Sequence, residues 1–336
     1  MRRIVSSFLL SCLFHLPAVA LAHDNTAPLA GEEAFTPPTV YEQLLRALMP
    51  DAEASATITV DGNYRLIQGN GYPDYTPGNF PNAHNPNAIR KKNYQLRVPL
   101  NPVMGAPRAT VRTPFGIALN GVLFDPGTAE YWRNDRNSGW NYEALGGACQ
   151  LGLDFSNAHV QPNGAYHYHG LPTGLLDRYA YRNSPALLGY AADGFPIYGP
   201  YGYKKADDPA SSMTQLKPGY RVKSGTRPSG PGGAYDGVFV QDWTYDKELG
   251  DLDECNGRVG VTPEYPDGTY YYVVSGEYPF IPRCWRGTPD SSFAALKGGP
   301  GGRPPGAGGN HQPGGRPPQG GMGGRPPMGG APCQGS

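Results

Sequence analysis

The residues with the clearest potential for chemistry are three histidines in the stretch DFSNAHVQPNGAYHYHG, namely His159, His167 and His169. The 336-residue chain holds only seven histidines, so three within one short window is a strong concentration. Neutral imidazole nitrogens are ligands of zinc and copper, and three of them can form most of a coordination sphere. The first question is therefore whether the local structure brings the three rings together.

The residues between the histidines indicate a β-hairpin, and its loop length decides the answer. A two-residue loop, Asn163-Gly164, would turn His159 to the face opposite the other two histidines. A three-residue loop, Pro162-Asn163-Gly164, pairs Gln161 with Ala165 and so sets His159 opposite His167. We favour the longer loop, because proline presets φ at the first turn position and glycine accepts the left-handed one.

In that register the three histidines share one face of the hairpin and predict a site for one copper or zinc ion. Directly opposite Cβ atoms lie about 5 Å apart, and i, i+2 neighbours about 7 Å apart, within reach of a common ion. Tyr166 and Tyr168 point to the other face, where they pack as core aromatics. The alternative is that the histidines are solvent-exposed and the hairpin is purely structural.

Other polar residues are weaker candidates for the same site. Asp193, in AADGFPIYG, is interpreted as an additional ligand or as a partner that orients a liganding imidazole. Alternatively, it begins a turn and its carboxylate bonds to its own backbone. Asp154 and Asn157 are candidates of the same kind, and His84 is a candidate further ligand.

The first 22 residues have the features of a signal peptide. Arg2 and Arg3 precede an apolar run over residues 4–14, and Ala20-Leu21-Ala22 resembles a cleavage site. The apolar run is too short for a transmembrane span. We therefore predict a secreted or periplasmic protein whose mature chain starts at His23. A terminal histidine can chelate copper with its amine and imidazole, but one residue more or fewer would abolish this, and the rest of the chain does not resemble enzymes with such a site.

The charge of the chain argues against a nucleic-acid partner, and its composition distinguishes the C-terminal tail from the rest. The chain has 28 basic and 28 acidic residues, which gives no basic face for nucleic acid. Residues 297–336 repeat Gly-Gly-Arg-Pro-Pro and have little apolar surface to bury, so this tail is expected to be disordered. On composition alone, removing residues 298–336 should leave the thermal midpoint unchanged. A role as a surface tether is the alternative.

The remaining chain predicts a mainly β fold. Residues 39–49, within the N-terminal segment 23–56, have helical spacing. Beyond them, ATITVDGNYRLIQ is a hairpin signature, and NYQLRVPL, FGIALNGVLF and GTYYYVVSG are short strand-forming runs separated by turns. Many short antiparallel strands over residues 57–296 indicate a β-sandwich-like single domain.

Four cysteines follow the signal peptide, and in an exported chain they are disulfide candidates. Cys255 and Cys284 flank the strand run GTYYYVVSG, so we expect them to pair. Cys149 and Cys333 then either pair with each other or remain free thiols.

Several blocks also resemble a known family. The stretch NAHVQPNGAYHYHGLP, followed by GYAADGFPIYG, LDECNGRVG and YPFIPR, is similar to the YHYH-domain family of exported proteins. FPNAHNPNAI and FGIALNGVLFDPG match as well, so the resemblance extends over roughly residues 57–288. It implies that these blocks belong to one domain, and by itself it assigns no reaction.

Three functions are compatible with the sequence. The leading hypothesis is an exported protein that binds copper or zinc. A metal-dependent hydrolase or oxidase with an open coordination position is the second, and it would need an acid or base beside the metal. The third is a cell-surface or matrix protein with a glycan or protein partner and a purely structural hairpin.

Overall fold

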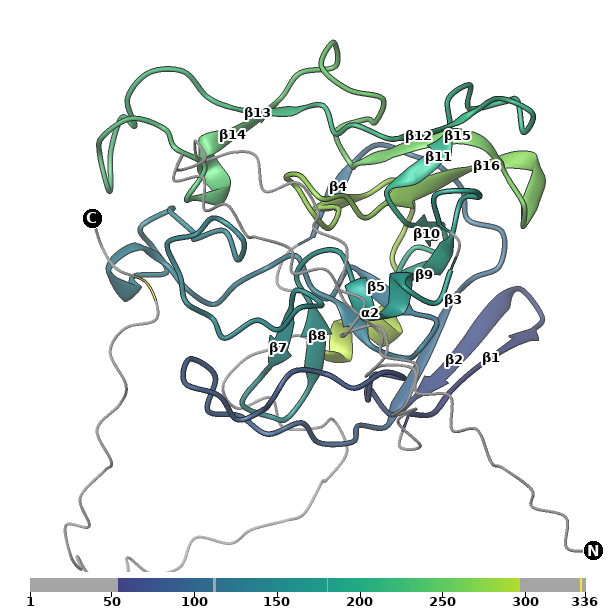
Figure 1. Ribbon diagram of the computed structural model, residues 1–336, viewed down its shortest axis with the longest axis horizontal. Helices are drawn as coiled ribbons and strands as arrows, with labels where there is room; N and C mark the ends of the chain where they lie inside the picture. The colour runs from purple at the N-terminus through teal and green to yellow at the C-terminus, as the bar shows by residue number, and fades with distance from the viewer. Residues whose placement is uncertain (1–53, 111–112, 180, 297–332, 334–336) are drawn as a thin grey trace, which may run out of the picture. The chain divides into compact units, whose positions relative to one another are not determined.

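The computed structural model describes residues 54–110, 113–179, 181–296 and 333 (Figure 1). An N-terminal hairpin joins β1 (Ala56–Asp61) to β2 (Tyr64–Gly69), with Asp61 opposite Tyr64 and β3 (Tyr94–Pro99) on the other side of β2. Gly62, at φ +56°, takes the left-handed conformation that this tight turn requires. The hairpin predicted around Asp61-Gly62 is confirmed.

The largest sheet has eight strands, most of them short. Their order across the sheet is β15 (Gly257–Thr262), β16 (Tyr265–Val273), β10 (Pro196–Tyr198), β9 (Leu187–Ala191), β5 (Gly116–Ala118), β6 (Leu123–Phe124), β8 (Tyr166–Tyr168) and β7 (Ala158–Val160). Its buried side chains are strongly aromatic; the largest fully buried ones include Phe115, Phe124, Tyr166, Tyr168, Tyr198, Tyr271 and Tyr272.

Smaller elements complete the described residues. Three two-stranded sheets pair β11 (Tyr201–Tyr203) with β12 (Met213–Gln215), β13 (Tyr220–Val222) with β14 (Trp243–Tyr245), and β17 (Cys284–Trp285) with β4 (Arg108–Ala109). The helical turns are α2 (Thr173–Leu176), η1 (Trp132–Asn134), η2 (Val240–Asp242) and η3 (Ser291–Leu296).

The predicted fold class, mainly β with many short antiparallel strands, is confirmed. The sequence did not indicate that two neighbouring pairs in the large sheet are parallel, β6 with β8 and β10 with β16. Parallel partners must come from separate parts of the chain, so no local turn signal announces them. The β6–β8 pair matters most, because β8 carries part of the histidine cluster.

Several expectations fall outside the described residues. They concern the signal peptide, the mature terminus at His23, the helix over residues 39–49 and the tail apart from Cys333. Among the residues that are described, no helix is long and apolar enough to cross a membrane.

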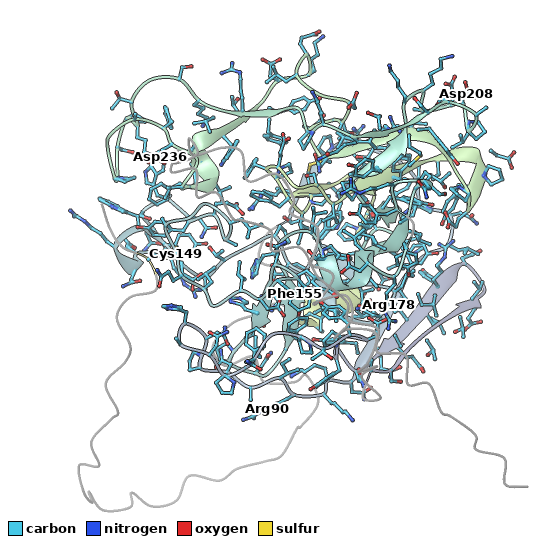
Figure 2. All side chains as sticks on the ribbon, viewed as in Figure 1. Arg90, Cys149, Phe155, Arg178, Asp208 and Asp236 are labelled. Carbon is cyan, nitrogen blue, oxygen red and sulfur yellow. A yellow bond between two sulfur atoms is a disulfide. The ribbon has the colours of Figure 1, made fainter. Side chains whose placement is uncertain are left out.

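Both disulfides are formed. Cys255 is bonded to Cys284 as predicted, and Cys149 is bonded to Cys333, which decides between the two alternatives for that pair. Cys149, labelled in Figure 2, belongs to a buried cluster with Trp140, Tyr142 and Phe239, and Cys333 packs against this cluster. Residue 333 is thus attached to the folded domain, which the composition of the tail did not indicate.

The Cys149–Cys333 bond changes the expected effect of removing the tail. It joins residues 184 apart in sequence, so its loss should lower the free energy of unfolding by about 2–4 kcal/mol, largely by releasing the unfolded chain. Urea denaturation of Cys333→Ser under non-reducing conditions measures this. A chain that lacks only residues 334–336 is the control and should unfold like the unaltered protein. Equal stability of all three would show that this bond does not stabilise the domain.

Candidate metal centre

The histidine hairpin has the register that the three-residue loop predicts. His159 on β7 lies opposite His167 on β8, and the Gln161 N–H donates to the Ala165 carbonyl at 2.9 Å. Gly164 has φ +85°, and a Cβ there would lie 2.6 Å from the Arg90 side chain. Glycine is therefore needed at this position both for the backbone conformation and for space.

The three imidazoles converge through their Nε2 atoms. The His169 Nε2 atom lies 2.9 Å from that of His167 and 3.1 Å from that of His159. The ring centroids form a nearly equilateral triangle with sides of 4.7, 4.8 and 4.8 Å. Nitrogens bound to one tetrahedral ion at 2.0–2.1 Å would be about 3.3 Å apart, so a small outward shift would admit a metal.

Backbone carbonyls orient two of the three rings. The Nδ1 atom of His159 is 2.8 Å from the Leu151 oxygen, and that of His167 is 3.2 Å from the Ala165 oxygen. A carbonyl can only accept, so each Nδ1 carries the proton and each Nε2 presents a lone pair to the centre. The buried Nδ1 of His169 has no regular hydrogen bond among the described residues.

Burial keeps these imidazoles neutral. It lowers the pKa of His159 to about 3, with His167 as the next cause, and lowers the pKa of His167 to about 4. The pKa of His169 falls well below 6.5, first through burial, then through the other two histidines and the positive charge of Arg283. His167 and His169 are each 3% exposed, and His159 is half-buried. Neutral imidazole is the form that binds a metal, so little proton competition is expected near neutral pH.

The opposite face of the hairpin is a hydrogen-bonded tyrosine cluster. The Tyr75 hydroxyl lies 3.1 Å from those of Tyr166 and Tyr168, and all three side chains are buried. Tyr166 donates to Asp154 at 2.7 Å, and the Asn120 amide donates to Tyr168 at 2.9 Å. The tyrosines thus pack in the core as predicted, but their hydroxyls also form a network that fixes the hairpin from behind.

Asp125 is a site residue that the sequence did not single out. Asp125 directly follows β6. Leu123 of β6 pairs with His167 of β8, so two residues further along Asp125 lies beside His169. The Asp125 N–H donates to the Tyr168 carbonyl at 2.9 Å. Burial raises the pKa of the Asp125 carboxyl, whereas the Gly127 N–H and then His159 oppose that rise. The only sequence feature that could have indicated Asp125 as a site residue is its position in FGIALNGVLFDPG, a block that resembles the family.

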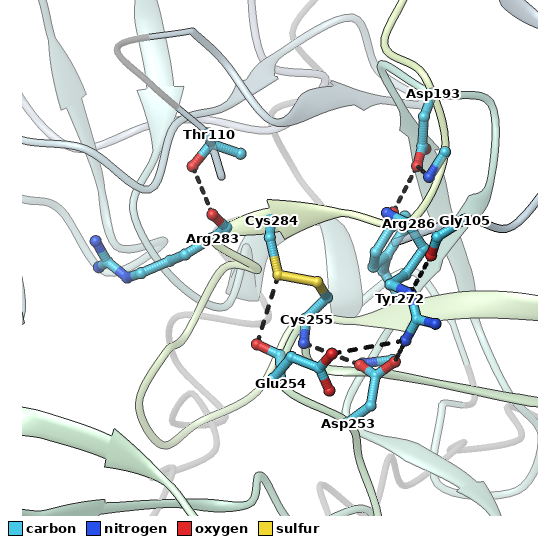
Figure 3. Close-up of a disulfide and its surroundings, with 12 residues drawn as sticks. Gly105, Thr110, Asp193, Asp253, Glu254, Cys255, Tyr272, Arg283, Cys284 and Arg286 are labelled. Carbon is cyan, nitrogen blue, oxygen red and sulfur yellow. Dashed lines mark hydrogen bonds and ion pairs between the residues drawn. A yellow bond between two sulfur atoms is a disulfide. The ribbon is translucent and has the colours of Figure 1, made fainter. Parts of the chain in front are cut away.

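A buried ion pair lies behind this centre. Arg283 is paired with Glu143, whose side chain is 1% exposed, and the Arg283 charge acts on both His169 and Asp125. The Arg283 backbone is held by Thr110, whose N–H and hydroxyl donate to its carbonyl at 2.9 and 3.0 Å (Figure 3). Arg283 directly precedes Cys284, so the Cys255–Cys284 disulfide helps to position it.

Asp193 lies outside the histidine group, because the only close cluster of metal-ligating side chains among the described residues is His159, His167 and His169. The Asp193 carboxylate accepts hydrogen bonds from the Tyr272 hydroxyl at 2.6 Å and from the Gly287 N–H at 2.8 Å (Figure 3). It also accepts from the N–H of Phe195 at 3.3 Å, the turn bond considered as the alternative. Burial raises its pKa to about 6.

The weaker candidates have structural contacts instead. Asp154 accepts the N–H groups of Gly78 and Ser156, both at 2.9 Å, besides the Tyr166 hydroxyl. Asn157 accepts the His169 N–H at 2.7 Å through its backbone carbonyl and so positions that ligand candidate. His84 is exposed and is not part of the histidine group.

Comparison with known proteins identifies the class of this mainly β chain. A family model described as YHYH protein matches residues 95–287, more than half of the chain, so the protein belongs to the YHYH family. The tetrapeptide at residues 166–169 is thus part of the matched region, and the family suspected from sequence is confirmed. No curated protein and no solved structure matches the chain.

The buried histidines should make the metal-free protein acid-sensitive. An imidazole whose pKa is lower in the folded than in the unfolded state stabilises the fold above about pH 6.5, and this contribution is lost as the pH falls toward 4. Between pH 7.0 and 4.5, the free energy of unfolding in urea should therefore fall less for His167→Gln than for the unaltered protein, with pH 5.5 as the intermediate point.

The variant comparison is needed because a buried carboxyl with a raised pKa, such as Asp193, has the opposite effect. It stabilises the folded protein increasingly as the pH falls over the same range. His84→Ala serves as the control and should follow the unaltered protein. If His167→Gln and the unaltered protein lose stability in parallel, His167 is not held neutral by the fold.

Proposed function

We propose that this YHYH-family protein is an exported metal-binding protein that holds one copper or zinc ion at His159, His167 and His169. The observation that carries the proposal is the convergence of three Nε2 atoms, two of them as lone pairs fixed by backbone carbonyls. These two lone pairs and the Nε2 atom of His169 face one centre, where a bound cation would be coordinated by all three nitrogens.

The ligand chemistry supports copper or zinc over harder ions. The three side chains offer only imidazole nitrogen, which suits zinc and copper, whereas calcium and magnesium prefer carboxylate and carbonyl oxygen. A three-histidine set also leaves at least one coordination position for water or a ligand. A given nitrogen site binds Cu²⁺ more tightly than Zn²⁺, so whether copper or zinc is bound depends on metal supply as well as on geometry.

Export is supported by two kinds of observation. The N-terminal 22 residues have the composition of a signal peptide. Two disulfides, Cys149–Cys333 and Cys255–Cys284, are typical of proteins that fold in an oxidising compartment. Together they favour a secreted or periplasmic site of action.

The unaltered protein should bind one zinc or copper ion per chain, and His167→Gln or His169→Gln should weaken binding on the order of 100-fold or more. Loss of a partner that only orients a ligand already costs 10–100-fold, so loss of a ligand should cost at least as much. Equilibrium dialysis with elemental analysis of tag-free protein measures both. His84→Gln, at an exposed histidine, is the matched control and should bind normally.

A change of loop length tests the hairpin geometry separately from the ligand types. One glycine inserted after Gly164 keeps all three histidines but turns His159 to the other face. Unchanged affinity in this variant would refute the hairpin site, and absence of metal from the reconstituted unaltered protein would refute the metal centre itself.

A metalloenzyme is the second candidate, and Asp125 favours it. Asp125 directly follows β6, which pairs with β8, and its charge raises the pKa of His159. A carboxylate this near a metal ligand would supply the acid or base that an enzyme needs. An enzyme-like centre requires an exchangeable coordination position, which a small anion can occupy. With Co²⁺ or Cu²⁺ bound, azide should then change the visible spectrum; an unchanged spectrum at saturating azide would favour a closed binding site.

A further inference from the structure

The outermost histidine of the cluster is held by a segment from outside the hairpin. His159 lies on β7, the last strand of the eight-stranded sheet, and is half-buried, whereas His167 and His169 are buried. The His159 Nδ1 donates to the Leu151 carbonyl at 2.8 Å. The carbonyl that orients His167 belongs to Ala165, two residues away in the hairpin itself. The orientation of His159 therefore depends on how the segment around Leu151 is fixed.

The Cys149–Cys333 disulfide is one support of that segment. Cys149 lies two residues before Leu151, and both belong to the buried cluster that includes Trp140 and Phe239. Cys333 packs against the same cluster, and an isolated antiparallel bridge pairs its backbone with that of Cys149. The disulfide thus joins a residue of the tail to the short stretch of chain that carries the Leu151 carbonyl.

A tight turn supports the other side of the same peptide group. Gly152 follows Leu151 with φ +66°, and the Asn82 amide donates to the Gly152 carbonyl at 3.0 Å. A Cβ at Gly152 would overlap the Oδ1 atom of Asn82, so this turn has no space for a side chain. The Leu151 carbonyl is therefore held between the disulfide on one side and the Gly152 turn on the other.

The Leu151 carbonyl decides whether His159 can bind a metal. A neutral imidazole has one proton, and a carbonyl that accepts from Nδ1 keeps the proton there. The His159 Nε2 then presents its lone pair toward His169, whose Nε2 lies 3.1 Å away. Without this acceptor, the proton can move to Nε2 and the ring can turn about its side-chain torsions. Either change removes one lone pair from the centre.

We propose that the Cys149–Cys333 disulfide positions His159 and makes the metal affinity of the centre depend on redox state. The inference rests on the proposed function, because it concerns the same three-histidine site. A dithiol reductant supplies two electrons and two protons, so the S–S bond breaks, two thiols form and the reductant becomes a disulfide. The Leu151 segment then loses this support, His159 loses its fixed tautomer, and the metal is bound more weakly.

Such a dependence suits an exported protein. In a reducing compartment the two cysteines are thiols, and His159 is not yet held in its metal-binding orientation. Oxidation after export closes the bond and completes the centre. The chain would therefore take up its metal ion outside the reducing compartment in which it is made.

The first test uses metal-free protein, so its result does not depend on a bound ion. Nitrogen chemical shifts of the imidazole rings distinguish the two neutral tautomers near neutral pH. Both His159 and His167 should carry the proton on Nδ1 in the unaltered protein. In Cys149→Ala/Cys333→Ala, which leaves no thiol to bind metal, His159 should lose this preference and His167 should keep it.

Two further variants separate this route from a general loss of stability. Cys255→Ala/Cys284→Ala lacks the other disulfide and is the matched control, in which His159 should keep its Nδ1 proton. Gly152→Ala retains both disulfides but displaces the peptide group of Leu151, so it should change the His159 tautomer as loss of the disulfide does. It also tests the link if a double cysteine variant fails to fold.

The second test is equilibrium dialysis of the same proteins against Zn²⁺. Cys149→Ala/Cys333→Ala should bind zinc on the order of 10-fold more weakly than the unaltered protein, as expected when a partner that orients a ligand is lost. A folded double variant in which His159 keeps its Nδ1 proton would overturn the proposal. So would a tautomer change in both His159 and His167, because it would show that the whole hairpin loosens.

The remaining outcomes distinguish this inference from the metal centre itself. An unchanged His159 tautomer in Gly152→Ala would overturn the role of the Leu151 carbonyl. Equal zinc affinity of the unaltered protein and Cys149→Ala/Cys333→Ala would overturn the redox dependence and leave the metal centre intact. Absence of zinc from both would refute the metal centre and the redox-dependent affinity, while the tautomer change would still show that the disulfide positions His159.

Discussion

The histidine face of this protein depends on the register of one β-hairpin. The Pro162-Asn163-Gly164 loop sets His159 opposite His167, and the strand alternation then sends the histidines to one face and the tyrosines to the other. A shift of one residue would mix the two faces. It would bury His159 among the tyrosine hydroxyls and break the cluster around Tyr75.

Burial gives the three imidazoles their chemistry. In water, histidine is half-protonated at pH 6.5, whereas here desolvation favours the neutral form far below that value. The carbonyls of Leu151 and Ala165 then decide which ring nitrogen is free. The positive charge of Arg283, which is paired with Glu143, further disfavours protonation of His169. The centre is thus a set of neutral donors before any ligand arrives.

The blocks that resemble the family divide between two places in the fold. NAHVQPNGAYHYHGLP and FGIALNGVLFDPG supply the histidines and Asp125, whereas LDECNGRVG contributes Asp253 and Arg258 to a cavity beside the Cys255–Cys284 disulfide. The segment around Cys284 serves both, because Arg283 acts on the histidines and Arg286 lines the cavity. One disulfide therefore braces both the segment that carries Arg283 and the wall of this cavity.

Short-range constraints determined much of this structure from sequence alone. Turn chemistry and the two-residue period of a strand were enough to predict the β1–β2 hairpin, the register of His159 with His167, and the mainly β fold. The Cys255–Cys284 pair followed because both cysteines flank the same strand. In each case the residues that decide the structure are close together in the chain.

Only the tertiary structure decided what depends on distant segments. The parallel pairing of β6 with β8 brings Asp125 to the histidines, and the Cys149–Cys333 bond attaches a residue of the tail to the domain. Asp193 was expected near the histidines, but it holds the Gly287 segment instead. Such placements arise from packing between segments far apart in sequence, which leave no periodic or turn signal in either segment.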